Sequence, residues 1–122
     1  MAADTTPDNL QPLTPIMFHI LLALANGEKH GYSIMKAVEF ETDGQISLLT
    51  GTLYRSLKRL LELGLVAESD ERPDPELDDE RRRYYRLTDT GQKALTAEAQ
   101  RMMRALAVMR RKQVLNDTPG GA

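Results

Sequence analysis

The sequence predicts an α+β fold that is mostly α-helical, with three short helices, a two-stranded β-hairpin and a long final helix in that order. Apolar residues recur at helical spacing within residues 15–26, 32–41, 50–63 and 88–116. Two short alternating segments, 65–69 and 83–87, flank a stretch containing Pro73 and Pro75, which suit a loop. This order of elements is the plan of a winged helix-turn-helix.

Length and composition predict one globular domain with a projecting helix. The chain has 122 residues, of which 41% are hydrophobic and 28% charged, as in ordinary folded proteins. We expect a disordered arm over residues 1–11, the winged helix over 12–87, a dimerisation helix over 88–116 and a disordered tail over 117–122. No segment resembles a signal peptide or is long enough to span a bilayer, so we expect a cytoplasmic protein without membrane contact.

Several kinds of chemistry are excluded by residue type. There is no cysteine, so no disulfide or thiolate metal site can form. His19 and His30 are the two histidines and have no pattern of metal ligands around them. No phosphate-binding glycine loop or paired nucleophile and base is present, so we expect neither a cofactor nor an enzyme.

Threonines mark the expected starts of three helices. Thr14 precedes Pro15, Thr50 precedes the third helix, and Thr88 precedes the last one. A threonine hydroxyl accepts from free N–H groups in the first helical turn, and proline suits that turn. We therefore expect these threonines to be N-caps.

The third predicted helix has two contrasting faces. Leucines at i, i+4, i+7 and i+8 form its buried face, and basic residues fall on the opposite one. Donors that could reach phosphates or base edges are Thr50, Thr52, Tyr54, Arg55, Lys58 and Arg59. The spacing of the charged residues alone fits a DNA-contacting face and a face that is simply exposed to water equally well.

Positive charge is local rather than global. Sixteen Lys and Arg oppose eighteen Asp and Glu, for a net charge of −2, which by itself argues against binding to nucleic acid. Only Lys29 and Lys36 precede position 53, and the remaining basic residues cluster in the second half. A DNA-binding face needs only local positive charge.

The predicted hairpin contains an acidic segment followed by a basic one. Eight acidic residues lie between Glu68 and Glu80, whereas Arg81, Arg82 and Arg83 begin the returning strand. DNA should repel the acidic tip, and the arginines could hold a phosphate backbone. Alternatively, the arginines pair internally with the acidic loop.

The final helix contains a heptad seam. Apolar residues recur at spacings of four, three, four and three: Leu95, Ala99, Met102, Leu106 and Met109. The alternative is that this helix packs back on its own domain. So small a domain can cover only part of it, which favours a homodimer.

Four ordered motifs strengthen this interpretation: His30-Gly31-Tyr32, residues 50–54 (TGTLY), residues 63–66 (LGLV) and residues 82–91 (RRYYRLTDTG). Together they resemble the PadR family of bacterial transcription regulators, in its shorter branch with a single C-terminal helix. The resemblance covers residues 13 to 112. It departs from the family pattern at Arg55, where proline is usual, and in the acidic hairpin tip.

The resemblance implies a homodimeric repressor that binds double-stranded DNA at a pseudo-palindromic promoter site, with release by a small-molecule effector of unknown identity. It also adds Tyr32 to the residues expected to contact DNA. Two rival functions remain at this stage. One is a winged-helix module that binds another protein through the acidic tip. The other is a ligand site between paired long helices, lined by Met102, Met103 and Met109.

Overall fold

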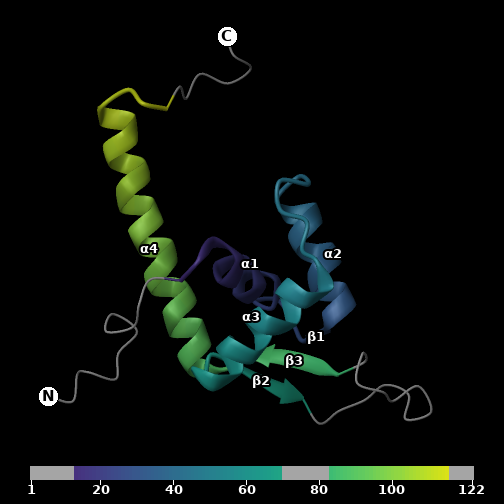
Figure 1. Cartoon of the computed structure of the whole chain (residues 1–122). Coiled ribbons are helices and arrows are strands. Elements are labelled where there is room, and N and C mark those ends of the chain that lie inside the picture. Colours follow the sequence, from purple (N-terminus) through teal and green to yellow (C-terminus); the bar gives the residue numbers. More distant parts are fainter. Residues whose placement is uncertain (1–12, 70–82, 116–122) are drawn as a thin grey trace, which may run out of the picture.

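The computed structural model describes residues 13–69 and 83–115. Its elements in chain order are α1 (Pro15–Ala23), β1 (Lys29–His30), α2 (Gly31–Glu41), α3 (Thr50–Glu62), β2 (Val66–Ser69), β3 (Tyr84–Leu87) and α4 (Asp89–Arg111). Figure 1 shows α1, α2 and α3 gathered beside a small sheet, with α4 projecting away from them. The predicted mostly helical winged helix is confirmed.

Threonine side chains cap the starts of α1 and α4 but not that of α3. Thr14 Oγ1 accepts from the Met17 N–H at 3.1 Å, and Thr88 Oγ1 accepts from the Gly91 N–H at 2.9 Å, as expected. The prediction for Thr50 is wrong, because Thr50 is the first residue of α3 and the N-cap is Leu49, which makes no side-chain cap. The helix begins one residue early because the Leu53 N–H already donates to the Leu49 carbonyl at 2.9 Å.

The sheet has three strands rather than the two of the predicted hairpin. β2 and β3 pair antiparallel, with Val66 opposite Leu87 and Ser69 opposite Tyr84. The two residues of β1 pair with the other edge of β3, which gives the order β1-β3-β2. A two-residue strand is too short to produce a periodic signal in the sequence.

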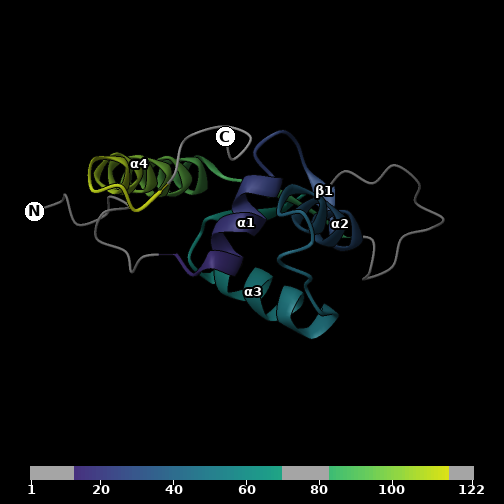
Figure 2. The same ribbon diagram turned by 90° about the horizontal axis from the view of Figure 1, so that it is seen from above.

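The core lies where the first three helices meet. Ile20 and Leu21 of α1, Ile34 of α2 and Leu53 of α3 are each 0% exposed. Seen from above, α4 lies on one side of α1 and α2 on the other (Figure 2). Burying such aliphatic side chains stabilises the fold by about 1.5–3 kcal/mol for each of them.

The base of α4 is fixed to the turn between α3 and β2. Thr88 Oγ1 donates to the Gly64 carbonyl at 2.7 Å, and the Thr88 N–H donates to the Leu65 carbonyl at 3.1 Å. One turn later, Gly91 is buried so closely against Leu65 that a Cβ there would overlap the Leu65 carbonyl oxygen. Leu95 follows at 6% exposed. The first two turns of α4 therefore belong to the domain core.

None of the helices within residues 13–69 and 83–115 combines the length and hydropathy needed to cross a membrane. The expected arm over residues 1–11, the hairpin tip and the tail over 117–122 lie outside the described residues.

We expect Gly91→Ala to lower the free energy of unfolding by about 1–3 kcal/mol, because the added methyl group meets backbone that cannot move aside as a side chain can. Urea denaturation followed by circular dichroism measures this change. Gly51→Ala is the matched control, since its new Cβ would approach only the Arg55 guanidinium, at 3.7 Å. A loss at Gly51 equal to that at Gly91 would contradict the close packing of α4.

Candidate nucleic-acid interface

α3 buries one face and exposes a basic one. Leu53, Leu57 and Leu60 are at most 1% exposed, so the helix cannot rotate without removing its leucines from the core. Residues on the opposite side are exposed: Arg55, Lys58 and Arg59. The amphipathic prediction for this helix is confirmed.

The basic side chains of α3 are weakly engaged. Arg55 Nη2 donates to Thr52 Oγ1 at 3.4 Å, and Arg59 lies 3.7 Å from the Glu62 carboxylate. The Arg59 and Glu62 side chains are 59% and 54% exposed, and ion pairs this open to solvent contribute about 0–1 kcal/mol. An incoming phosphate can therefore compete for these cations.

The first turn of α3 is open to a ligand. Thr50 and Gly51 are exposed, and no side chain caps the helix. The first N–H groups of a helix carry a partial positive charge and bind phosphate readily. Because Thr50 does not cap α3, the first N–H groups of the helix and the Thr50 hydroxyl are both available to a ligand.

The two tyrosines expected at the interface lie in different environments. Tyr32, in the first turn of α2, is 60% exposed, and Lys36 Nζ lies 5.6 Å from its ring centroid. Tyr54 is half-buried, and its hydroxyl lies so close to Gly31 that a Cβ there would overlap it. The Tyr54 hydroxyl therefore joins α3 to the start of α2 rather than facing solvent.

The described part of the wing contains an internal ion pair. Arg83 Nη1 lies 3.1 Å from Glu68 Oε2 across the β2–β3 hairpin, with both side chains about two-fifths exposed. At Arg83, the alternative of internal pairing therefore matches the structure. Arg81, Arg82 and the acidic tip lie outside the described residues.

Tyr85 of β3 belongs to the hydrophobic core, against which Tyr54 of α3 also packs. Tyr85 is 4% exposed. Burial raises the pKa of its phenol above the ordinary value of 10.0; nearby Tyr54 and Glu68 raise it further, and Arg83 lowers it. Tyr85 therefore remains a neutral anchor throughout the physiological pH range.

His30 has a role that the sequence did not indicate. Its Nδ1 accepts from the Ser33 N–H at 3.3 Å, which caps α2, and its Nε2 lies 3.1 Å from Ser33 Oγ. The same ring packs edge-on against Tyr84 of β3, with centroids 5.4 Å apart. His30 therefore connects α2 with the wing. Within the described residues, no group of three or more potential ligands could hold a metal ion.

Beyond its buried base, α4 exposes part of the predicted heptad seam. Ala99 and Leu106 are half-buried, and Met102 and Met109 are 45% and 36% exposed. Leu95 instead packs into its own domain. The part of the seam that a second chain could cover therefore begins at Ala99.

A family model described as the transcriptional regulator PadR-like family matches residues 20–97. The chain belongs to this family. No curated protein sequence matches it. Solved PadR-like structures share its fold. A PadR family transcription regulator from Clostridium difficile is 27% identical, with a TM-score of 0.66 over 82% of this chain and 99% of its own.

Two further structures support the assignment to the PadR-like family. A transcriptional regulator from Clostridium thermocellum is 26% identical, with a TM-score of 0.64 over 79% of this chain and 90% of its own. Bacillus subtilis PadR, solved in complex with operator DNA, is 25% identical, with a TM-score of 0.58 over 69% of this chain and 46% of its own. This PadR-like chain therefore has the fold of transcriptional regulators.

The buried phenol of Tyr85 predicts an alkaline loss of stability. The pKa of this phenol is raised in the folded chain only. Its contribution to the free energy of unfolding is therefore fully present below about pH 10 and is lost as the pH rises through the folded pKa. We expect the free energy of unfolding to fall less steeply between about pH 9 and 11 in Tyr85→Phe than in the wild type, as measured by urea denaturation. Tyr32→Phe, at an exposed ring, should keep the wild-type slope. Equal slopes in all three proteins would contradict the burial of this phenol.

Proposed function

We propose that this chain is a sequence-specific DNA-binding repressor that binds a pseudo-palindromic promoter site as a homodimer. The observation that carries the proposal is the basic face of α3, fixed outward by the burial of Leu53, Leu57 and Leu60 on the other side. A helix held in this way can enter the major groove and present side chains to base edges. Repression follows if the bound dimer excludes polymerase from the promoter.

The likeness to Bacillus subtilis PadR supports DNA as the partner, because that protein is solved with its operator. In our proposal Thr50, Thr52 and Tyr32 contact phosphates, and Arg55, Lys58 and Arg59 contact phosphates or bases. Tyr54 acts by holding α3 against α2, through its contact with Gly31. Arg81 and Arg82 contact the flanking backbone, whereas Arg83 must first leave Glu68 to do so.

The exposed seam of α4 supports the homodimer. Met102, Leu106 and Met109 repeat at spacings of four and three on a helix that projects from the domain (Figure 1). A two-fold axis through paired α4 helices would place two α3 helices on one side of the DNA. Their half-sites would be about 10 base pairs apart, or a multiple of that spacing.

Removing single cations from α3 tests the DNA interface. We expect Arg55→Ala to weaken binding to the DNA upstream of the chain's own gene by about 1–3 kcal/mol if the guanidinium contacts a base. Lys58→Ala should reduce the slope of log affinity against log salt by about 1 if it contacts a phosphate. Fluorescence anisotropy at several salt concentrations measures both quantities.

Lys93→Ala is the control for these variants, because Lys93 is exposed on α4 and does not belong to the basic face of α3. Its affinity and salt slope should equal those of the wild type. The proposal fails if the wild-type chain shows no salt-dependent preference for this DNA over a scrambled sequence. An unchanged affinity and slope in both α3 variants would place the interface elsewhere.

A charge in the exposed seam tests the dimer. We expect Leu106→Glu to convert the dimer to a monomer, because two carboxylates would have to be buried against each other. Sedimentation equilibrium measures the mass. Arg104→Glu introduces the same side chain on the opposite side of α4 and should remain dimeric. A dimeric Leu106→Glu would rule out this seam as the interface.

A further inference from the structure

Leu49 places an apolar side chain in solvent at the start of α3. It is 74% exposed, more than any other leucine within residues 13–69 and 83–115. The preceding residue, Leu48, is 7% exposed and belongs to the hydrophobic core. The backbone at this point therefore directs one leucine inward and holds the next one outward.

Leu49 also fails to supply what the start of a helix needs. It is the N-cap of α3, and it makes no side-chain hydrogen bond to the free N–H groups of the first turn. Thr14, His30 and Thr88 make such bonds in α1, α2 and α4. Leucine is among the least favourable N-cap residues, so neither the core nor the helix accounts for it. A residue that breaks a local rule in this way is expected at a functional surface.

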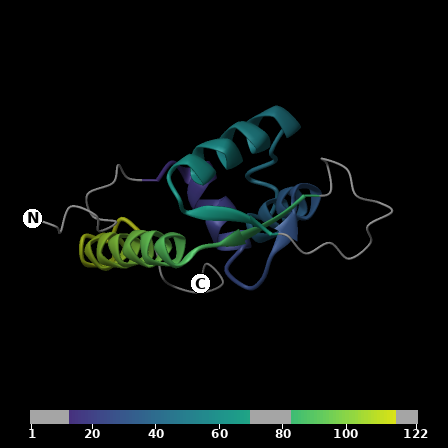
Figure 3. The same ribbon diagram turned by 90° about the horizontal axis from the view of Figure 1, so that it is seen from below.

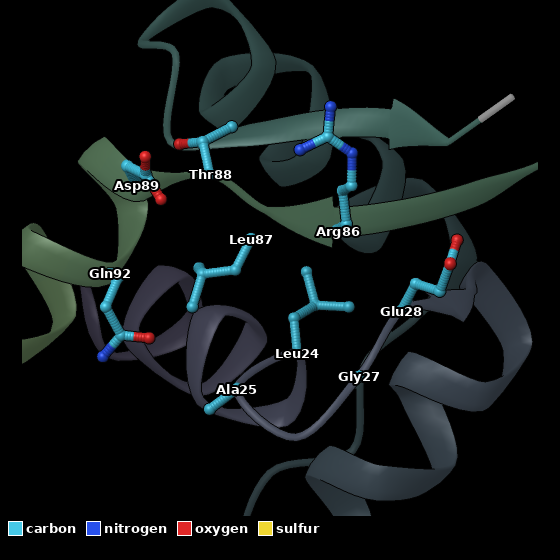
Figure 4. Close-up of a pocket in the computed structure, with 9 residues that line it drawn as sticks. All are labelled: Leu24, Ala25, Gly27, Glu28, Arg86, Leu87, Thr88, Asp89 and Gln92. Atoms are coloured by element: carbon cyan, nitrogen blue, oxygen red, sulfur yellow. The ribbon is translucent and has the colours of Figure 1, made fainter.

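Leucines at a hollow elsewhere on the surface are covered by the chain itself. A pocket of about 310 Å³ has Leu24 and Leu87 at its centre (Figure 4). Its lining residues come from the segment after α1, from β3 and from the start of α4. Leu24 is 2% exposed and Leu87 is half-buried. Leu49 lies outside this pocket and keeps most of its side chain open to a partner.

Arg55 brings a guanidinium group back to the first turn of α3, which follows Leu49. Its Nη2 donates to Thr52 Oγ1 at 3.4 Å, and its Nη1 lies 3.7 Å from the position that a Cβ on Gly51 would occupy. Gly51 is exposed and has no side chain to keep a partner at a distance. Figure 3 shows this turn at the end of α3 that lies away from α4. The tip of the helix therefore presents an apolar side chain and a cation beside open backbone.

These two groups match two features of base edges in the major groove. The C5-methyl of thymine is the apolar group that base pairs present there, and guanine O6 and N7 accept from arginine. In helix-turn-helix proteins the N-terminal residues of the recognition helix contact the base edges. A phosphate could pair with Arg55, but it offers no apolar surface to a leucine. We propose that Leu49 contacts the methyl group of a thymine in each half-site, beside a guanine that Arg55 contacts.

This inference rests on the proposed function and specifies which bases the tip of α3 distinguishes. Deoxyuridine tests the thymine contact, because uracil pairs with adenine as thymine does and lacks only the C5-methyl. Footprinting maps the site upstream of the chain's own gene, each thymine in it is replaced in turn, and fluorescence anisotropy measures the affinity. We expect the wild-type chain to lose about fourfold in affinity at one thymine of each half-site, as burial of one methyl group implies. Leu49→Ala should bind the thymine and uracil forms of that position equally.

The guanine is tested with 7-deazaguanine, which lacks the N7 acceptor. The wild-type chain should bind this DNA at least about fivefold more weakly, because a hydrogen bond to a charged donor is lost. Arg55→Ala should bind the guanine and 7-deazaguanine forms equally. The sensitive guanine should be the neighbour of the sensitive thymine.

Leu115→Ala is the matched control, because it makes the same change at another exposed leucine, which follows α4. It should keep the wild-type preference for thymine over uracil. Leu49→Ser supplies the N-cap hydroxyl that α3 lacks. It should unfold at the same urea concentration as the wild type or a higher one, and yet lose the preference for thymine.

The proposal is overturned if each thymine methyl matters as much to Leu49→Ala as to the wild type, or if the sensitive thymine and guanine are not neighbours. A lower urea midpoint in Leu49→Ser would assign the leucine to the fold and would also overturn it. A wild-type chain that prefers its own DNA to a scrambled sequence but ignores every thymine methyl refutes this contact and leaves the proposed repressor standing. A wild-type chain without that preference refutes the proposed function itself, and this contact with it.

Discussion

The burial of the leucine face of α3 against α1 and α2 is the constraint on which the rest of the molecule depends. Leu53, Leu57 and Leu60 have almost no exposed surface, and together they determine which way the helix is turned. Arg55, Lys58 and Arg59 lie on the face of the helix opposite these leucines, and they therefore point outward. The position of the basic surface is thus a consequence of apolar packing. Tyr54 of α3, through its contact with Gly31 of α2, and Tyr85 of the sheet reinforce this packing.

Contacts at Leu65 join the domain core to the base of α4. The backbone of this residue lies against Gly91 and accepts from Thr88, so the base of α4 is continuous with the domain core. The exposed part of α4 therefore projects from a base that is fixed to the domain. In a dimer joined through this helix, the orientation of each α3 would be set by the packing of the base of α4 on Leu65 and by the pairing of the exposed seams.

Long periodic segments could be predicted from the sequence, and short or three-dimensional features could not. The leucine spacing in residues 50–63 predicted both faces of α3, and Thr14 and Thr88 marked two helix starts correctly. The Thr50 cap was wrong because Leu49 enters the helical hydrogen-bond pattern first. Leu95 belongs to the heptad pattern, but whether a seam residue faces its own domain or a second chain depends on how much of the helix the domain covers.

At the candidate interface, the basic residues of α3 could be located from periodicity, but their partners could not. The pairing of Arg83 with Glu68 depends on the register of the hairpin, and the contact of the Tyr54 hydroxyl with Gly31 depends on the angle between two helices. The third strand has a further consequence for folding. Lys29 pairs with Tyr85, more than fifty residues away, and loop-closure entropy makes such a distant pairing slow to form. We therefore expect β1 to join the sheet after the helices have packed around their leucines, at a rate set by chain topology rather than by the strength of the pairing between two residues.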